Sequence, residues 1–143
     1  MGQDRGVKRY PVVVLALLLA LTGCAQLWGT GDWDRIVVTV TGGTGADDPG
    51  DYTLDVTATQ VSYELNGERT TGTMPDGAWE TLATGVRALG DRRGAACPDG
   101  QEILIQAKAG SEVKQTFQAS SCDAGDAFRQ ARTLIEALTK YVQ

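Results

Sequence analysis

The chain has 143 residues, with 18 acidic side chains, 13 lysines and arginines and a formal net charge of -5 at pH 7, a length that suits one modest folded domain. The acidic balance argues against nucleic-acid binding, which needs a basic surface. The sequence contains no histidine, which removes the commonest general base and zinc ligand, so we expect no metal, no cofactor and no enzyme.

The first 23 residues have the pattern of a secretion signal. Arg5, Lys8 and Arg9 form a positively charged start, and residues 11–21 form an apolar run. This run is too short for the hydrocarbon core of a bilayer, which takes roughly 20 residues, but it has the length of a signal-peptide apolar region.

The apolar run ends in Leu21-Thr22-Gly23-Cys24, which resembles the lipobox of bacterial lipoprotein signals. The resemblance implies that the Cys24 thiol receives a diacylglyceryl group, with fatty chains such as palmitate, and that cleavage makes Cys24 the first residue. Two or more acyl chains anchor a protein stably, since each buried methylene contributes about 0.8 kcal/mol. We therefore expect a lipoprotein on the extracytoplasmic side of a cell membrane. An uncleaved anchor and an ordinary secreted protein are the alternatives.

Residues 24–33 are expected to be a short membrane tether and residues 34–143 a single domain. At about 3.5 Å per residue, residues 25–32 reach under roughly 30 Å, which keeps the domain close to the membrane. Two tryptophans, Trp28 and Trp33, flank the tether. The sequence favours Trp33 as a cap on the core and a disordered Trp28, and it leaves open an interfacial anchor beside the lipid.

Four strands are expected in the first half of the domain. The first is rich in β-branched residues, and the next two alternate apolar and polar side chains. Asn66-Gly67 follows the third strand and is a strong hairpin signal, because both residues tolerate positive φ. The fourth is polar, which is typical of a strand at the edge of a sheet. The expected strands cover residues 35–41, 52–58, 60–65 and 68–73.

The second half is expected to form a helix, a strand pair and a final helix. Pro75 opens a helix that reaches about residue 89, strands at 102–107 and 113–119 flank a turn at Gly110-Ser111, and the last helix covers 123–142 with Asp123 as its N-cap. Both helices carry one apolar stripe, formed by Trp79, Leu82, Ala83, Val86 and Leu89 and by Phe128, Ala131, Leu134, Ile135, Leu138, Tyr141 and Val142. The order of elements predicts an α+β fold, with an antiparallel sheet of five or six strands and both helices packed on one face.

Cys97 and Cys122 are predicted to form one disulfide. An even pair of cysteines oxidises outside the cytoplasm, and the turn at Gly110-Ser111 places the two nearly opposite each other at the open end of the hairpin. Two free thiols serving redox chemistry are disfavoured, because the chain lacks a close Cys-x-x-Cys spacing.

Three short motifs are interpreted as surface turns. The acidic stretch 47–51 offers oxygen ligands but lacks the spacing of a calcium-binding EF-hand loop. The glycine-rich stretch 42–45 lacks the lysine of a phosphate loop. Arg92 and Arg93 are expected at a solvated loop tip, with a recognition site as the alternative.

Residues 37–122 resemble the subtilisin inhibitor-like family of secreted protease inhibitors. The matching residues are Val38-Thr39-Val40, Thr53-Leu54, Pro75, Cys97-Pro98, Gly110 and Phe117 leading to Cys122. The resemblance implies a sheet with two helices and an exposed loop, opened by Cys97-Pro98, that lies in a protease cleft. Pro98, Asp99 and Gly100 then form a possible binding loop. Asp99-Gly100 suits a subtilisin-type pocket poorly, and the family's second disulfide has no cysteines here.

We therefore expect a non-catalytic domain that binds a protein or an envelope ligand through a sheet face or through the loop at 90–100. Its expected partners are the membrane, through the lipid on Cys24, and an envelope protein or protease. A protease inhibitor that presents residues 97–100 is the main alternative. A hydrolase that uses two carboxylates is the third possibility.

Overall fold

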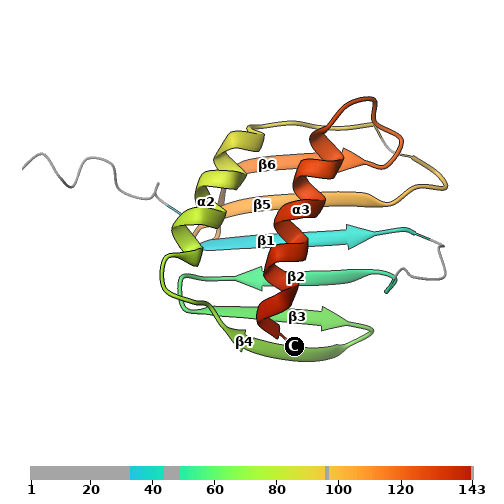
Figure 1. Ribbon diagram of the computed structural model, residues 1–143. Helices are drawn as coiled ribbons and strands as arrows, with labels where there is room; N and C mark the ends of the chain where they lie inside the picture. Colours follow the sequence, from blue (N-terminus) through green and yellow to red (C-terminus); the bar gives the residue numbers. More distant parts are fainter. Residues whose placement is uncertain (1–32, 44–48, 96, 143) are drawn as a thin grey trace, which may run out of the picture.

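A computed structural model describes residues 33–43, 49–95 and 97–142 of the chain. They form one six-stranded sheet in the order β4-β3-β2-β1-β5-β6, in which all neighbouring strands are antiparallel (Figure 1). The strands are β1 (Arg35–Thr41), β2 (Tyr52–Val56), β3 (Gln60–Leu65), β4 (Glu68–Thr73), β5 (Glu102–Ala109) and β6 (Glu112–Ser120). The helices are α2 (Ala78–Leu89) and α3 (Ala127–Thr139), followed by a short 3-10 turn, η1 (Lys140–Val142).

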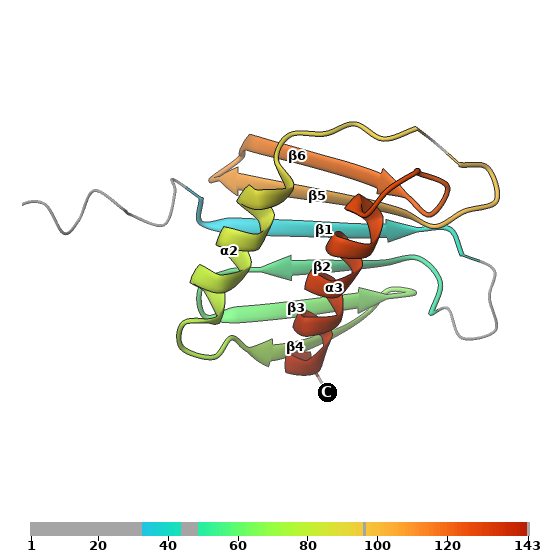
Figure 2. The ribbon, with the colours of Figure 1, turned by 45° about the horizontal axis from the view of Figure 1, so that its top comes forward.

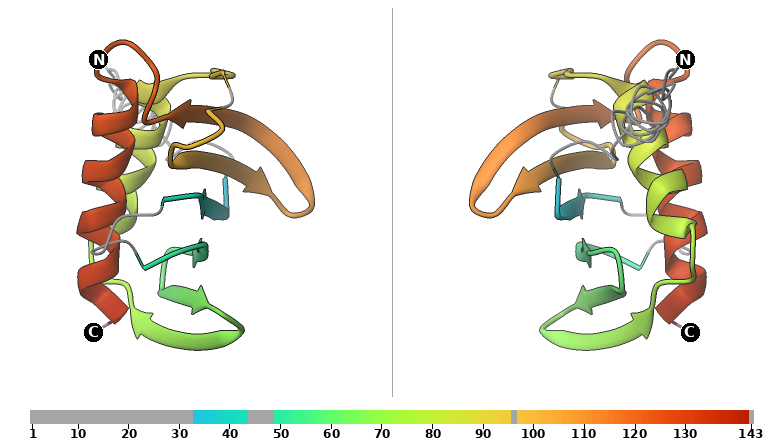
Figure 3. Two further views of the ribbon diagram at one scale, coloured as in Figure 1. Left: turned by 90° about the vertical axis from the view of Figure 1, so that its right-hand side faces the viewer. Right: turned by 90° about the vertical axis from the view of Figure 1, so that its left-hand side faces the viewer.

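Both helices lie side by side on one face of the sheet, so the described chain has two layers (Figure 3). The buried core lies between these layers. Every second residue of β1 points into it, and its cross-strand neighbours on β2 and β5 do the same. The helices supply their apolar stripes, with Trp79, Leu82, Ala83 and Val86 buried on α2 and Ala131, Ile135 and Leu138 on α3. The predicted α+β architecture is confirmed.

The predicted strand bounds agree with the structure for β1, β3 and β4, and β4 lies at an edge as its polar sequence predicts. β2 ends at Val56, because the Thr57 amide donates to the Gln60 carbonyl at 2.9 Å and closes the turn into β3. The last hairpin is longer than predicted, and its register shifts between Ala107 and Lys108. A bulge of this kind inserts one residue, which the sequence pattern does not reveal.

The prediction that Asp123 is the N-cap of the last helix is wrong. Helix α3 begins at Ala127, with Asp126 at the N-cap position, after a turn in which Gly125 has a φ of 113°. The Asp123 carboxylate instead accepts a hydrogen bond from the Ser120 amide at 2.9 Å and pairs with Arg92 at 3.4 Å. It therefore fastens the end of β6 to the loop that follows α2.

The loop after α2 runs along the outer edge of β6 (Figure 2). The Arg92 amide donates to the Thr116 carbonyl at 3.0 Å, and the Gln118 amide donates to the Arg92 carbonyl at 2.8 Å. The Asp91 carboxylate accepts from the Thr116 amide at 2.9 Å. Arg92 is thus part of the sheet edge, and its prediction as a solvated tip is wrong, whereas Arg93 is exposed.

Trp33 packs against the core, as predicted, and the Arg87 guanidinium lies 4.8 Å from its ring centroid. The signal segment, Cys24 and Trp28 lie outside the described residues. In the described ranges, no helix is long and apolar enough to cross a membrane.

Candidate functional site

The sheet face opposite the helices is free of covering elements in the part of the chain that the structure describes (Figure 3), and we call it the open face. Two rows of side chains cross it in register. One row is Thr71, Ser62, Asp55, Val37, Gln106 and Thr116, and the other is Arg69, Glu64, Thr53, Thr39, Leu104 and Gln118. All members except Val37 and Leu104 are polar. The open face is therefore a hydrogen-bonding surface.

Ion pairs balance the charges of the open face on strands β1 to β4. The Arg35 Nε donates to the Asp55 carboxylate at 2.6 Å, and this contact raises the pKa of the Arg35 guanidinium above its usual value. The Arg69 Nε donates to the Glu64 carboxylate at 3.1 Å. Because opposite charges are paired, this part of the open face presents no strong field of one sign.

The middle of the open face, on β1 and β2, carries the Arg35–Asp55 ion pair and has no net charge. Thr39 and Thr53 face each other across β1 and β2, with Val37 and Leu104 beside them. On the β6 side, the Gln118 side-chain amide donates to the carboxylate of Glu102, the first residue of β5. A centre whose charged groups are paired with each other limits the cost of bringing a partner against it, because unpaired charges lose the most when they leave water.

A shallow cleft of about 170 Å³ lies at one end of the open face. Its lining includes Thr41, Thr53, Asp51, Glu64 and Asn66. The Asp51 carboxylate accepts a hydrogen bond from the Gly42 amide at 2.9 Å, which ties together the two sides of the 42–51 loop. Asp47 and Asp48 lie outside the described residues. In the described ranges, no three acidic, cysteine or histidine side chains form a group able to hold a metal ion.

The disulfide between Cys97 and Cys122 is present, with the two Cα atoms 6.0 Å apart. It closes a turn in which the Gly100 amide donates to the Cys97 carbonyl at 3.2 Å. Of the predicted binding loop, Pro98 and Asp99 are exposed, whereas Gly100 is half-buried. A Cβ atom at Gly100 would lie 2.4 Å from the Cys97 sulfur, so this position needs glycine.

Two hydrogen bonds fasten the end of this turn to the residue before Cys122. The Gln101 amide donates to the Ser121 hydroxyl at 3.0 Å, and the Ser121 amide donates to the Gln101 carbonyl at 2.8 Å. Together with the disulfide, these bonds hold Pro98 and Asp99 in one place on the surface. The structure therefore presents both residues on a turn that the disulfide and these hydrogen bonds hold in place. We call residues 97–100 the braced turn.

Ser120 is buried, and its hydroxyl has no hydrogen-bond partner among the described residues. The carboxylate nearest in sequence, Asp123, is engaged by the Ser120 amide and by Arg92. A serine nucleophile needs a base within hydrogen-bond reach of its hydroxyl. The Ser120 hydroxyl has no such contact in the described chain.

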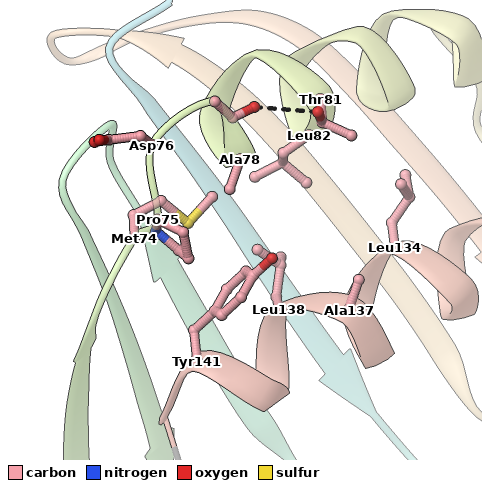
Figure 4. A pocket seen from close by; sticks show the side chains of 11 residues that line it. Met74, Pro75, Asp76, Ala78, Thr81, Leu82, Leu134, Ala137, Leu138 and Tyr141 are labelled. Carbon is pink, nitrogen blue, oxygen red and sulfur yellow. Dashed lines mark hydrogen bonds between the residues drawn. The ribbon is translucent and has the colours of Figure 1, made fainter.

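The sequence did not predict a groove of about 380 Å³ between the start of α2 and the end of α3 (Figure 4). Its walls are mostly apolar and include Met74, Ala78, Leu82, Ala137 and Tyr141. The groove was missed because the stripes of both helices were assigned to the core. Ala137, which is exposed and lies outside the predicted stripe, was the one signal of a wider apolar surface on α3.

Comparisons with known protein families, curated proteins and solved structures find no match for this chain. The likeness to subtilisin inhibitor-like proteins stays a prediction. The features that bear on function are therefore the open face, the braced turn and the groove.

Proposed function

We propose that the chain is an extracytoplasmic lipoprotein, anchored through lipid on Cys24, whose folded domain binds a protein or envelope ligand without catalysis. The observation that supports the binding role is the open face. Six strands present a continuous polar surface, while both helices and the whole apolar core lie behind it.

The side chains of the open face favour recognition by contact. Antiparallel sheets often leave one face to solvent, and such a face is commonly rich in charge. Here the charged residues are paired with each other, and the centre offers threonine hydroxyls next to Val37 and Leu104. A neutral centre lowers the desolvation cost of a contact, because charged groups lose the most when they leave water.

A photo-crosslinking residue placed at Thr39 tests this proposal in cells that make the anchored protein. We expect a covalent adduct to a protein or to envelope material from Thr39, since this position lies at the centre of the open face. The same residue at Gln130, which is exposed on α3, is the matched control. The proposal is wrong if Thr39 gives no adduct, or if Gln130 gives the same adduct with equal yield.

A second candidate function is protease inhibition through the turn at residues 97–100, and the exposure of Pro98 and Asp99 on a disulfide-closed turn favours it. Inhibitory loops gain affinity from being held in the bound conformation before binding. Oxidised protein should then inhibit one or more serine proteases stoichiometrically, and reduction of the disulfide should weaken inhibition. Asp99→Leu should extend inhibition to proteases with apolar pockets, whereas Asp76→Leu, at another exposed turn, should not. Titrations that detect no inhibition by oxidised protein or by Asp99→Leu dismiss this candidate.

A further inference from the structure

The groove between α2 and α3 is an apolar surface that the packing of the described residues leaves uncovered. Leu82 and Leu138 form its buried floor, and Ala137 and Tyr141 stand at its margin (Figure 4). Thr81 also lines it, but its hydroxyl donates to the Gly77 carbonyl at 3.1 Å. The groove therefore suits an apolar side chain better than a polar ligand.

The size of the groove limits what can occupy it. One turn of an α-helix, about 10 Å across and 5.4 Å long, displaces more than the 380 Å³ of the groove. A stable contact with a second copy of a protein buries about 800 Å² on each partner, far more than a groove of this size offers. One or two side chains from an extended segment are the occupants that fit.

The chain itself brings such a segment to α2. Trp33 packs against the core, with the Arg87 guanidinium over its ring, so the tether leaves the domain beside this helix. Arg87 lies five residues after Leu82 and nine after Ala78, which are both groove residues. A rise of 1.5 Å per residue and a helix diameter of about 11 Å put the groove about 13 to 18 Å from Arg87.

The tether has both the length and the side chains to reach the groove. Leu27-Trp28 is the large apolar pair in a segment that is otherwise small and polar, AQLWGTGD. Leu27 lies six positions before Trp33, and an extended chain covers about 20 Å over that distance. A segment attached this closely has an effective concentration on the order of millimolar, so even a contact of low intrinsic affinity is occupied.

We propose that Leu27 and Trp28 dock in the groove between α2 and α3. The docked pair covers the apolar walls with side chains of the same molecule, and the thioether of Met74 adapts to the indole ring, as methionine does in contacts with aromatic groups. The docking depends on residues 27–33 and the helices. It does not depend on lipid at Cys24.

Docking would fix the orientation of the domain on a membrane. Cys24 lies three residues before Leu27, so an anchored chain would hold the groove within roughly 11 Å of its lipid. The helical layer would then face the bilayer, and the open face, on the opposite side of the sheet, would point away from it (Figure 3).

Fluorine NMR of the full mature protein in detergent micelles, labelled with 5-fluorotryptophan, tests the docking. Trp28→Phe assigns the Trp28 resonance, and a peptide of residues 24–32 gives the undocked reference. Ala137→Glu adds a negative charge at the groove margin. Gln130→Glu adds the same charge elsewhere on α3, so it serves as the control. The resonance of Trp79, which is buried in the core, reports whether each variant is folded.

We expect the Trp28 resonance to differ from that of the peptide, to move most of the way to the peptide value in Ala137→Glu, and to stay in place in Gln130→Glu. A Trp28 resonance equal to that of the peptide overturns the proposal. A distinct resonance that Ala137→Glu does not move also overturns it, and points to contact with the micelle. Repeating the measurement with residues 25–143, made without the signal segment and without lipid, separates this result from the question of lipid attachment, since docking should persist there.

Discussion

Gln115 is a polar residue that the fold uses inside its core. Its side-chain amide donates to the carbonyl of Val86 at 2.7 Å and to that of Gly90 at 3.0 Å. These carbonyls lie at the end of α2, where backbone acceptors have no partner within the helix. One side chain of β6 thus joins the sheet to the end of a helix that is distant in sequence.

Replacing Gln115 with alanine should therefore destabilise the fold. The change leaves two carbonyls without their donor, and each unsatisfied buried group costs about 1–3 kcal/mol. We expect a lower midpoint of urea unfolding for Gln115→Ala, and little change for Gln130→Ala, which alters an exposed glutamine. Equal midpoints would mean that water satisfies these carbonyls.

Tyr63 gives the fold a dependence on alkaline pH. Its ring lies 5.2 Å from that of Tyr52, and burial raises the pKa of the Tyr63 hydroxyl above its usual value of 10. The folded state thus favours the neutral phenol, and the resulting stabilisation is complete below the unfolded pKa and lost as pH rises through the folded pKa.

The free energy of unfolding should consequently fall as pH rises above about 10, the usual tyrosine pKa, and this fall should be smaller in Tyr63→Phe. Chemical denaturation at a series of pH values between neutral and strongly alkaline measures both slopes. Tyr141→Phe is a suitable control, since it also removes one phenol. Parallel curves for wild type and Tyr63→Phe would contradict the argument.

The last hairpin combines the longest strand pairing of the described sheet with the disulfide. β5 and β6 pair along their whole length, and the disulfide joins the segments just beyond their open end. The loop that the disulfide closes has a sequence separation of 25. In the chain-entropy model, closing a loop of this length stabilises the folded state by about 3.5 kcal/mol.

Removing both sulfurs should lower stability by an amount of that order. We expect the double variant Cys97→Ser, Cys122→Ser to keep its fold and to unfold at a clearly lower urea concentration. The loss acts through the unfolded chain, so the circular dichroism spectrum of the folded state should change little. A midpoint equal to that of wild type would show that the crosslink contributes nothing to stability.

Local patterns in the sequence were enough to predict most of the elements. The alternation in β3, the Asn66-Gly67 turn and the three- and four-residue spacing in α2 each depend on neighbours within one element. The disulfide followed from two cysteines flanking one hairpin. These features need no knowledge of distant contacts.

The errors concern residues whose partners are distant in sequence, or strands whose pairing register shifts at a bulge. Arg92 looked like a solvated tip, but it bonds to Thr116 and Gln118 along the edge of β6. Asp123 is a residue type that commonly caps helices, but its carboxylate pairs with Arg92 and accepts a hydrogen bond from the Ser120 amide. Of the candidate sites, the braced turn was predicted, whereas the groove was not, because its walls come together only when α2 and α3 pack.

At the scale of the whole molecule, the proposed anchoring of the protein depends on one thiol. Cys24→Ser should block acyl transfer and cleavage, because the oxygen cannot replace the sulfur that the lipobox pattern implies. We expect an unprocessed chain without fatty chains, detected by mass spectrometry, and a folded domain with unchanged urea unfolding. A variant that still carries lipid would exclude Cys24 as the attachment site.

The two margins of the sheet differ in a way that limits self-assembly. Residues 91 and 92 occupy the outer side of β6 at Thr116 and Gln118, which blocks a further strand there, whereas in the described chain no further backbone segment hydrogen-bonds to the outer side of β4. A fibre that grows by repeated strand addition needs two free margins on every molecule, one to donate and one to receive. With a single free margin, two molecules joined β4 to β4 leave no free end, so strand pairing ends at a closed pair.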